Sequence, residues 1–139
     1  METSFFIIKP EAMKYQKQIK SIITSSGLSI VSTKTLILSS AVLKELYPTI
    51  SIELWKATLT YLSHNESEMG IVEGENAIKR LLIIGGESTN PKLCNPNSIR
   101  GRFGEKEAVY IGGVIYYKNG FHRSHNKLEA IRDINLFYL

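Results

Sequence analysis

The stretch "SFFIIKPEA", residues 4–12, decides the first part of the fold because a short apolar run meets a lysine-proline pair. Four consecutive aromatic and branched side chains are typical of a strand buried inside a sheet. Pro10 ends that strand and suits the first turn of a helix, where Glu11 favours the positive helix end. We therefore predict a strand over 4–9 that leads directly into a helix ending near Gly27.

Strand-like and helix-like patterns then alternate along the chain. Further strands are predicted over 28–38, 68–74 and 120–122, and further helices over 41–47, 51–63, 75–84 and 125–138. Residues 85–104 form a long loop rich in Asn, Pro, Gly and Ser, and loops of this length are usually functional or disordered. The β-prone run 108–117 contains two central glycines and is predicted to be a hairpin.

This order of elements favours one α+β domain over residues 1–139. A ferredoxin-like βαββαβ sandwich fits best, with an antiparallel sheet covered by helices. The hairpin is then an extra insertion near residues 105–118.

Composition limits the classes of protein to which the chain can belong. Its 139 residues are 43% hydrophobic and 22% charged, as in a soluble globular protein. No run approaches the roughly 18 to 20 apolar residues of a membrane helix, the N-terminus lacks signal-peptide features, and one cysteine fits a reducing compartment. We expect a cytoplasmic protein without a membrane partner. The net charge of +4 favours an anionic ligand: nucleic acid, a phosphate compound or acidic lipid.

The segment "NGFHRSHN", residues 119–126, holds the main candidate for chemistry. His122 lies between a short strand and a helix start, where free N–H groups attract anions and a neutral imidazole can attack phosphorus. It needs a partner for one ring nitrogen, and Asp133 reaches it only if the strand and last helix fold together. A surface or structural role is the commoner one for such a histidine. His122 and His125 as a metal pair are disfavoured because no acidic or cysteine cluster accompanies them.

The long loop is the second candidate for a functional segment. It contains Thr89, Asn90 and Arg100, and the forked guanidinium of arginine matches phosphate oxygens. The segment "SIRGRFG" also fits an RNA-facing element, although one arginine pair is a weak signal. Lys9 at a strand end either points into a crevice or caps the chain. Neither a Walker sequence nor a GxGxxG element is present.

The motifs taken in order resemble the nucleoside diphosphate kinase family. "FFIIKPEA", "IVEGENAI", "TNP", "SIRGRFG" and then "NGFH" before a final helix form a specific set that spans nearly the whole chain. The resemblance implies a ping-pong reaction in which a nucleoside triphosphate gives its γ-phosphoryl group to His122 and a diphosphate then takes it. It also implies broad base specificity and a homo-oligomer, either a dimer, a tetramer or a hexamer.

The resemblance also implies roles for individual residues around the substrate. Lys9 and Asn119 would bind the ribose hydroxyls, while Thr89 and Arg100 would hold the phosphates. Tyr47 would sit beside Lys9 and the histidine. Mg²⁺ would enter bridging the nucleotide phosphates, with no metal site of the protein itself.

Two further positions implied by the resemblance concern orientation and the base. Ser124 and Asp133 would orient His122, Asp133 standing where the family has a glutamate. The base would lie against Trp55, the better stacking group, or against Leu54, which fits the register equally well.

Several residues depart from the family pattern. Arg123 stands where the family usually has glycine and His125 where it has aspartate, so Arg123 is expected to clash or to add a phosphate contact. Arg102 replaces an aspartate. The phosphate-binding arginine of the family's third helix has no clean match, and Arg80 is the nearest candidate.

These departures leave three hypotheses for the function. The first is a divergent but active nucleoside diphosphate kinase. The second is a catalytically weakened nucleotide-binding or regulatory protein on the same fold, and the third, less favoured, is a nucleic-acid-binding module that uses the basic surface.

Overall fold

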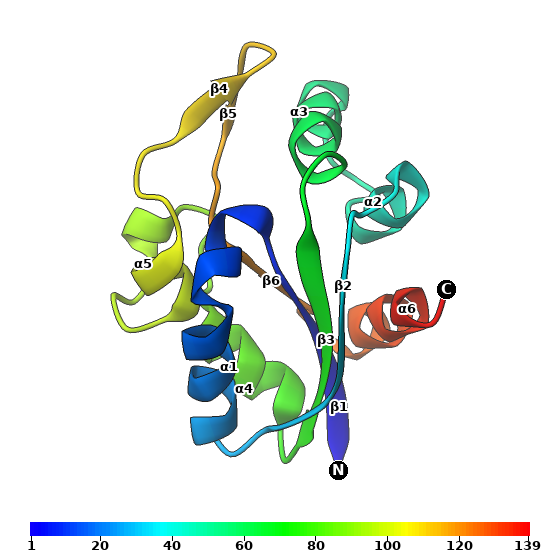
Figure 1. The fold of residues 1–139 in the computed structure, drawn as a ribbon, viewed down its shortest axis with the longest axis vertical. Helices are drawn as coiled ribbons and strands as arrows, with labels where there is room; N and C mark the ends of the chain where they lie inside the picture. The colour runs from blue at the N-terminus through cyan, green and yellow to red at the C-terminus, as the bar shows by residue number, and fades with distance from the viewer.

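Four antiparallel strands form the central sheet of the computed structural model, which describes residues 1–139 (Figure 1). Their spatial order is β2-β3-β1-β6, and they comprise β1 (Glu2–Ile8), β2 (Ser29–Leu36), β3 (Ser67–Gly74) and β6 (Phe121–Arg123). A separate two-stranded sheet pairs β4 (Val109–Ile111) with β5 (Val114–Tyr116). The predicted ferredoxin-like sandwich with an inserted hairpin is therefore confirmed.

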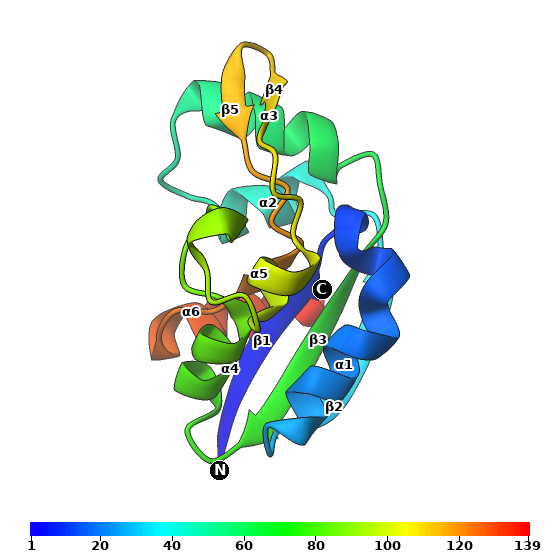
Figure 2. The same ribbon diagram turned by 90° about the vertical axis from the view of Figure 1, so that its left-hand side faces the viewer.

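Helices cover both faces of the sheet (Figures 1 and 2). On one face lie α1 (Gln16–Ser25), which follows the 3-10 helix η1 (Pro10–Tyr15), and α4 (Ala77–Gly85). On the other face lie α2 (Ser40–Leu46) and α6 (Lys127–Phe137), with α3 (Ile52–Leu62) beyond the end of the sheet. No helix is both long enough and apolar enough to cross a membrane.

The apolar run of β1 builds two separate cores because strand side chains alternate between faces. Phe6 and Ile8 pack with the buried residues of α1 and α4, whereas Phe5 and Ile7 pack with those of α2, α3 and α6. All four side chains are at most 1% exposed. A sheet covered on both faces thus explains why this strand is continuously hydrophobic.

The long loop is more ordered than its composition predicts. It contains the 3-10 turn η2 (Pro91–Leu93) and the short helix α5 (Ile99–Phe103). The hydroxyl of Ser98 caps α5 by accepting a hydrogen bond of 3.0 Å from the Gly101 N–H. This helix brings Arg100 to the end of the sheet.

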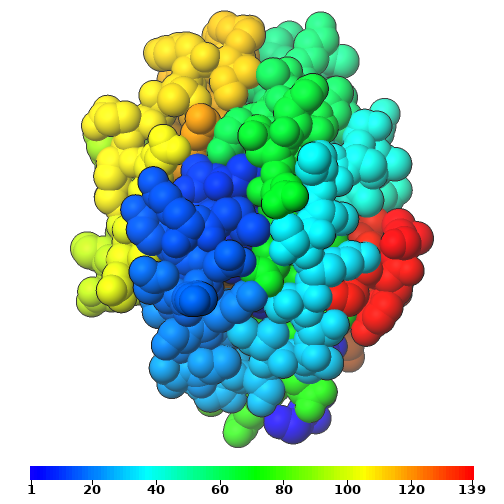
Figure 3. Space-filling model, in the orientation of Figure 1, coloured from blue at the N-terminus to red at the C-terminus, as the bar shows by residue number.

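The hairpin lies against α3 at one end of the molecule, as the space-filling view also shows (orange against green, Figure 3). Tyr116 in β5 meets Tyr61 in α3 edge to face, with ring centres 5.8 Å apart. The Nζ of Lys118 lies 4.5 Å from the centre of the Tyr61 ring. Tyr61 is therefore the residue of α3 that holds the insertion in place.

Gly70 in β3 makes room for the aromatic pair that supports β6. A Cβ at this position would lie 2.1 Å from Cζ of Phe6. The Phe6 ring in turn stacks on Phe121, with centres 5.7 Å apart and planes at 18°. This packing connects β3 to β6, the strand that carries His122.

We expect Gly70→Ala to lower the free energy of unfolding by about 1–3 kcal/mol, because the added methyl overpacks this ring pair. Denaturant unfolding gives the value. Gly112→Asn is the matched control: no atom lies within 4 Å of a Cβ there, and asparagine tolerates its φ of 59°. Equal losses in the two variants would contradict the role assigned to Gly70.

Candidate active site

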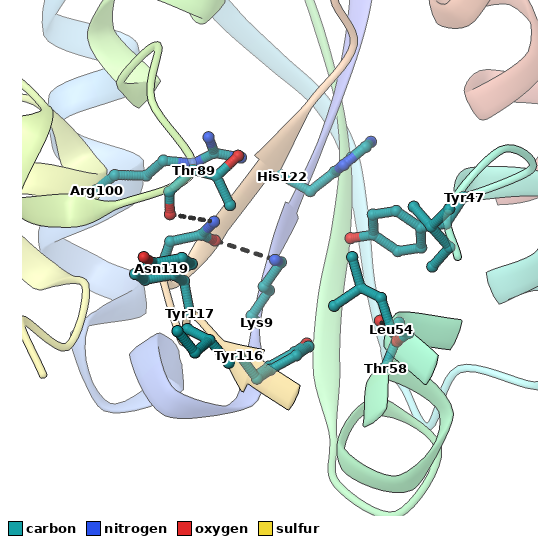
Figure 4. A pocket seen from close by; sticks show the side chains of 12 residues that line it. Lys9, Tyr47, Leu54, Thr58, Thr89, Arg100, Tyr116, Tyr117, Asn119 and His122 are labelled. Carbon is teal, nitrogen blue, oxygen red and sulfur yellow. Dashed lines mark hydrogen bonds between the residues drawn. The ribbon is translucent and has the colours of Figure 1, made fainter. Parts of the chain in front are cut away.

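A cavity of about 330 Å³ opens between the hairpin, α3 and the adjoining ends of β1 and β6 (Figure 4). It is lined by Lys9, Tyr47, Ile50, Leu54, Thr58, Thr89, Arg100, Ile115, Tyr116, Tyr117, Asn119 and His122. Seven of the residues that the sequence singles out therefore meet in one place: Lys9, Tyr47, Leu54, Thr89, Arg100, Asn119 and His122. The cavity joins cationic, hydroxyl and amide groups on one side to apolar side chains on the other.

His122 is held rigidly at the inner end of this cavity. It pairs with Ile7 across the sheet, and its ring lies edge-on to Phe5 and Tyr47, with centres 6.1 and 5.9 Å away. Its Nε2 lies 3.4 Å from Oδ2 of Asp133, and Nδ1 has no hydrogen-bond partner in the protein. A neutral ring that donates from Nε2 carries its lone pair on Nδ1.

Burial lowers the pKa of His122 to about 4, against the opposing effect of the hydrogen bond and charge of Asp133. Lys9 and Arg100 lower the pKa further through their positive charges. The imidazole is therefore neutral at neutral pH, which is the protonation state a nucleophile requires.

Asp133 reaches His122 although it is one methylene shorter than glutamate. It is fully buried, and its Oδ2 accepts a hydrogen bond of 2.7 Å from the Ser124 hydroxyl, while Arg132 Nε donates to Oδ1 at 2.8 Å. Burial acts to raise the pKa of Asp133, but the hydrogen bonds from His122, Ser124 and Arg132 outweigh it and lower the pKa. The carboxylate stays ionised and bound from three sides.

Lys9 and Asn119 form a second buried pair at the cavity wall (Figure 4). Lys9 Nζ donates to Oδ1 of Asn119 at 3.0 Å, and Nδ2 of Asn119 donates to the Thr89 carbonyl at 3.1 Å. Burial, with the charges of Arg100 and Arg123, lowers the pKa of Lys9 to about 8, and only Glu11 opposes this. A bound anion would raise this pKa again, because it stabilises the charged ammonium group.

Arg100 completes the cationic side of the cavity. Its Nε donates to the Phe121 carbonyl at 2.8 Å and its Nη1 to the Ser88 carbonyl at 2.9 Å. Its side chain is buried, and burial lowers its pKa. With backbone carbonyls as its only hydrogen-bond partners, this guanidinium keeps charge available for an anion.

Glu11 is a positioning residue that sequence reasoning reads only as a helix-start charge. Its Oε2 accepts from the Gly120 N–H and its Oε1 from the Tyr61 hydroxyl, both at 2.8 Å. One carboxylate therefore ties the segment after Lys9 to the "NGFH" turn and to α3. The sequence offers no signal for this because the partners lie 50 and 109 residues away.

The hairpin contributes cavity-lining side chains that the sequence does not single out. Ile115, Tyr116 and Tyr117 lie on or just after β5, and Thr58 faces them from α3. The pair Tyr116-Tyr117, close before Asn119 in the sequence, is the one signal that could have identified this wall of the cavity.

Three expected or suspected residues lie outside the cavity. Arg80 donates to the Ser26 carbonyl at 2.8 Å, beyond the C-terminal end of α1. Trp55 lines a neighbouring groove with Tyr47 and Ile50, because adjacent residues of a helix point about 100° apart and Leu54 takes the cavity side. Arg102 is exposed and lies over the Phe103 ring at 5.2 Å.

The two departures beside His122 also turn away from the cavity. Arg123 pairs with Phe6 and so lies on the opposite face of the sheet from His122, and it is not among the side chains that line the cavity. His125 Nδ1 lies 2.9 Å from Oε1 of Glu129. No group of three His, Cys, Asp or Glu side chains could hold a metal ion.

A sequence model of the family described as nucleoside diphosphate kinase matches residues 2–139. The chain belongs to the nucleoside diphosphate kinase family. The family and enzyme class predicted from the motifs are thereby confirmed.

Individual members of the family show how far this chain has diverged. The nucleoside diphosphate kinase of Bdellovibrio bacteriovorus is 29% identical over 141 residues, which cover 99% of this chain and 93% of that protein. The one from Desulfovibrio desulfuricans is 33% identical over 117 residues, which cover 81% of this chain and 84% of that protein. A solved structure of the enzyme from Borrelia burgdorferi aligns with a TM-score of 0.84 at 25% identity, and it covers 99% of this chain and 87% of its own. It is described as a transition state mimic with bound vanadate and ADP.

We expect Leu54→Ala to weaken ADP binding by about tenfold, because it removes apolar surface from the cavity wall. Trp55→Ala should change the affinity much less, since its side chain lines the neighbouring groove. Isothermal titration calorimetry measures both. A larger loss in Trp55→Ala than in Leu54→Ala would show that the base lies in the groove instead.

The pKa of His122 also predicts how stability depends on pH. The unfolded chain takes up this proton near pH 6.5, whereas the folded chain does so only near pH 4, so the free energy of unfolding falls as the pH drops through that window. We expect the fall between about pH 7.5 and about pH 4.5 to be up to about 3 kcal/mol larger in wild type than in His122→Gln. Urea unfolding at both pH values measures it, and parallel losses would contradict the buried neutral imidazole.

Proposed function

We propose that this chain transfers the γ-phosphoryl group of a nucleoside triphosphate to a nucleoside diphosphate through a phosphohistidine at His122. The observation that carries the proposal is a buried, neutral imidazole held at Nε2 by Asp133, with Nδ1 left for the substrate. Lys9 and Arg100 lie beside it as buried cations. These groups supply the positioning and charge stabilisation on which phosphoryl transfer depends.

In the first half-reaction the lone pair on Nδ1 of His122 attacks the γ-phosphorus. The Nδ1–P bond forms as the bond from γ-phosphorus to the bridging oxygen breaks, and the nucleoside diphosphate leaves with those electrons. The ring gains positive charge, which the carboxylate of Asp133 stabilises through the Nε2 proton. In the second half-reaction a terminal oxygen of another diphosphate attacks the phosphorus, and Nδ1 recovers its lone pair.

The substrate would lie along the cavity with its phosphates toward His122. Thr89 and Arg100 would bind the phosphates, while Lys9 and Asn119 would bind the ribose. The base would rest against Leu54 at the apolar end. In support, the Borrelia burgdorferi enzyme of similar fold is described with vanadate and ADP bound.

A divalent cation is a general requirement of the family, and we propose that Mg²⁺ serves here. The cavity lining holds lysine, arginine, threonine and asparagine but no carboxylate, so its donor set fits a nucleotide whose phosphates already carry the cation. When bound, the cation would neutralise charge that develops between the β- and γ-phosphates.

We also propose a homo-oligomer, either a dimer, a tetramer or a hexamer. The edge strand β2 supports it, because Val31 within the strand and Ile37 directly after it are each 54% exposed. A nucleotide-binding protein without transfer is the second candidate function. It is favoured by the placement of Arg80, which leaves no arginine of α4 in the cavity.

We expect the wild-type protein incubated with γ-labelled ATP to acquire acid-labile label that His122→Ala does not acquire. His64→Ala is the matched control, since His64 is exposed at the end of α3 and bonds only to its own turn. Equal labelling of wild type and His122→Ala would refute the phosphohistidine. ADP binding without label in wild type would favour the second candidate, and salt-dependent binding of single-stranded DNA that mononucleotides do not compete would favour a nucleic-acid module.

A further inference from the structure

Arg123 occupies an unusual place for a charged side chain. It is 1% exposed and heads the fully buried side chains in size. Because it follows His122 in β6, it points to the opposite face of the sheet, where it meets the end of α4. Gly85 leaves the space for it, since a Cβ there would lie 3.2 Å from Cδ of Arg123.

Its guanidinium belongs to a row of contacts that hold the loop after α4. The carbonyl oxygens of residues 87–89 each accept a hydrogen bond from a different side chain. In chain order the donors are Arg123 Nη2 at 3.3 Å, Arg100 Nη1 at 2.9 Å and Asn119 Nδ2 at 3.1 Å. Arg100 and Asn119 line the cavity and Arg123 does not. The loop that carries Thr89 is therefore fixed from the cavity side and from the far side of the sheet.

The position of the guanidinium is itself fixed by α6. Arg123 Nη1 lies 3.3 Å from Nε2 of His125, and Nδ1 of His125 lies 2.9 Å from Oε1 of Glu129. The Glu129 carboxylate also accepts from the His125 N–H at 3.2 Å. Because a guanidinium can only donate, Nε2 of His125 acts as the acceptor for Arg123 and Nδ1 as the donor to Glu129. One line of polar contacts thus runs from Glu129 to the carbonyl of residue 87.

Arg123 does not have the contacts of a residue kept for stability alone. Its direct hydrogen-bond partners are a carbonyl and an imidazole, its Nε is buried without a partner, and no carboxylate pairs with it. Burial, and then the charge of Arg100, lower its pKa to about 10. A buried charge without an ionic partner carries a desolvation cost that an apolar side chain does not carry.

We propose that Arg123 is a positioning residue for the loop 86–90. Its guanidinium holds the carbonyl of residue 87, so that Thr89 faces the substrate phosphates. His125 and Glu129 fix the position of the guanidinium. This inference rests on the proposed function, in which that loop binds phosphate. It assigns a role to the two side chains that depart most from the usual family pattern beside His122.

The first test compares Arg123→Met with Arg102→Met in steady-state phosphoryl transfer. Methionine keeps the apolar stem and removes the guanidinium, and the control removes the same charge from an exposed residue. We expect KM for the nucleoside diphosphate to rise roughly tenfold or more in Arg123→Met, while kcat changes by less than about threefold. The control should keep the wild-type KM. The Tm of nucleotide-free Arg123→Met should not fall.

The second test uses the half-exposed His125, where a substitution does not endanger the core. His125→Ala removes the acceptor for Arg123, and we expect it to raise KM by about threefold or more. His125→Gln keeps an acceptor oxygen near the position of Nε2 and should restore the wild-type KM. Comparing the two separates support of the guanidinium from simple loss of the histidine.

Two results would overturn the proposal. One is an unchanged KM in both Arg123→Met and His125→Ala. The other is a joint fall of Tm, kcat and nucleotide affinity in His125→Ala that is equally large in His125→Gln. Failure of the proposed function is recognised separately, because wild type would then form no phosphohistidine. In that case ADP binding by calorimetry replaces KM, and an Arg123→Met affinity equal to wild type would still refute the positioning role.

Discussion

The site depends on the hydrogen bonds made by the buried carboxylate of Asp133. An ionised carboxylate inside a protein costs several kcal/mol unless hydrogen-bond donors surround it. Here Ser124, Arg132 and His122 provide them, from the end of β6 and from α6 itself. The same contacts press α6 onto the sheet and leave the histidine one orientation and one tautomer. The fold and the geometry of the site therefore depend on the same set of hydrogen bonds, whose first member, His122, lies only eleven residues before the carboxylate.

The protein also buries three cationic side chains that form no salt bridge. Lys9, Arg100 and Arg123 are each at most 7% exposed, and backbone carbonyls, an amide and an imidazole are their close partners. Such an arrangement is unfavourable in the empty protein and favourable once polyanionic phosphates enter. Preorganised charge of this kind commonly lowers the stability of the resting state. The burial of His122 adds a neutral imidazole to the same region.

The sequence predicts the strands, most helices and the meeting of distant motifs, because local periodicity and motif order determine them. Prediction from the sequence fails where a shift of one residue changes the direction in which a side chain points. The side chains of Leu54 and Trp55 point about a third of a helical turn apart, so one lines the cavity and the other the neighbouring groove. The side chains of His122 and Arg123 point to opposite faces of the sheet. Helix α5 is missed because five residues give too little pattern. The role of Glu11 depends on contacts across 50 and 109 residues, which no local signal records.

The hairpin has a consequence for motion in the site. A two-stranded hairpin is marginally stable by itself, and a Cβ added at Gly112 or Gly113 in its tip would have no atom within 4 Å. It packs on α3 at Tyr61, whereas His122 sits in a strand of the central sheet. Local opening of this wall therefore requires less free energy than global unfolding, and its amides exchange with solvent sooner than those of β1 and β3. The cavity can therefore widen at this wall while His122 stays in place.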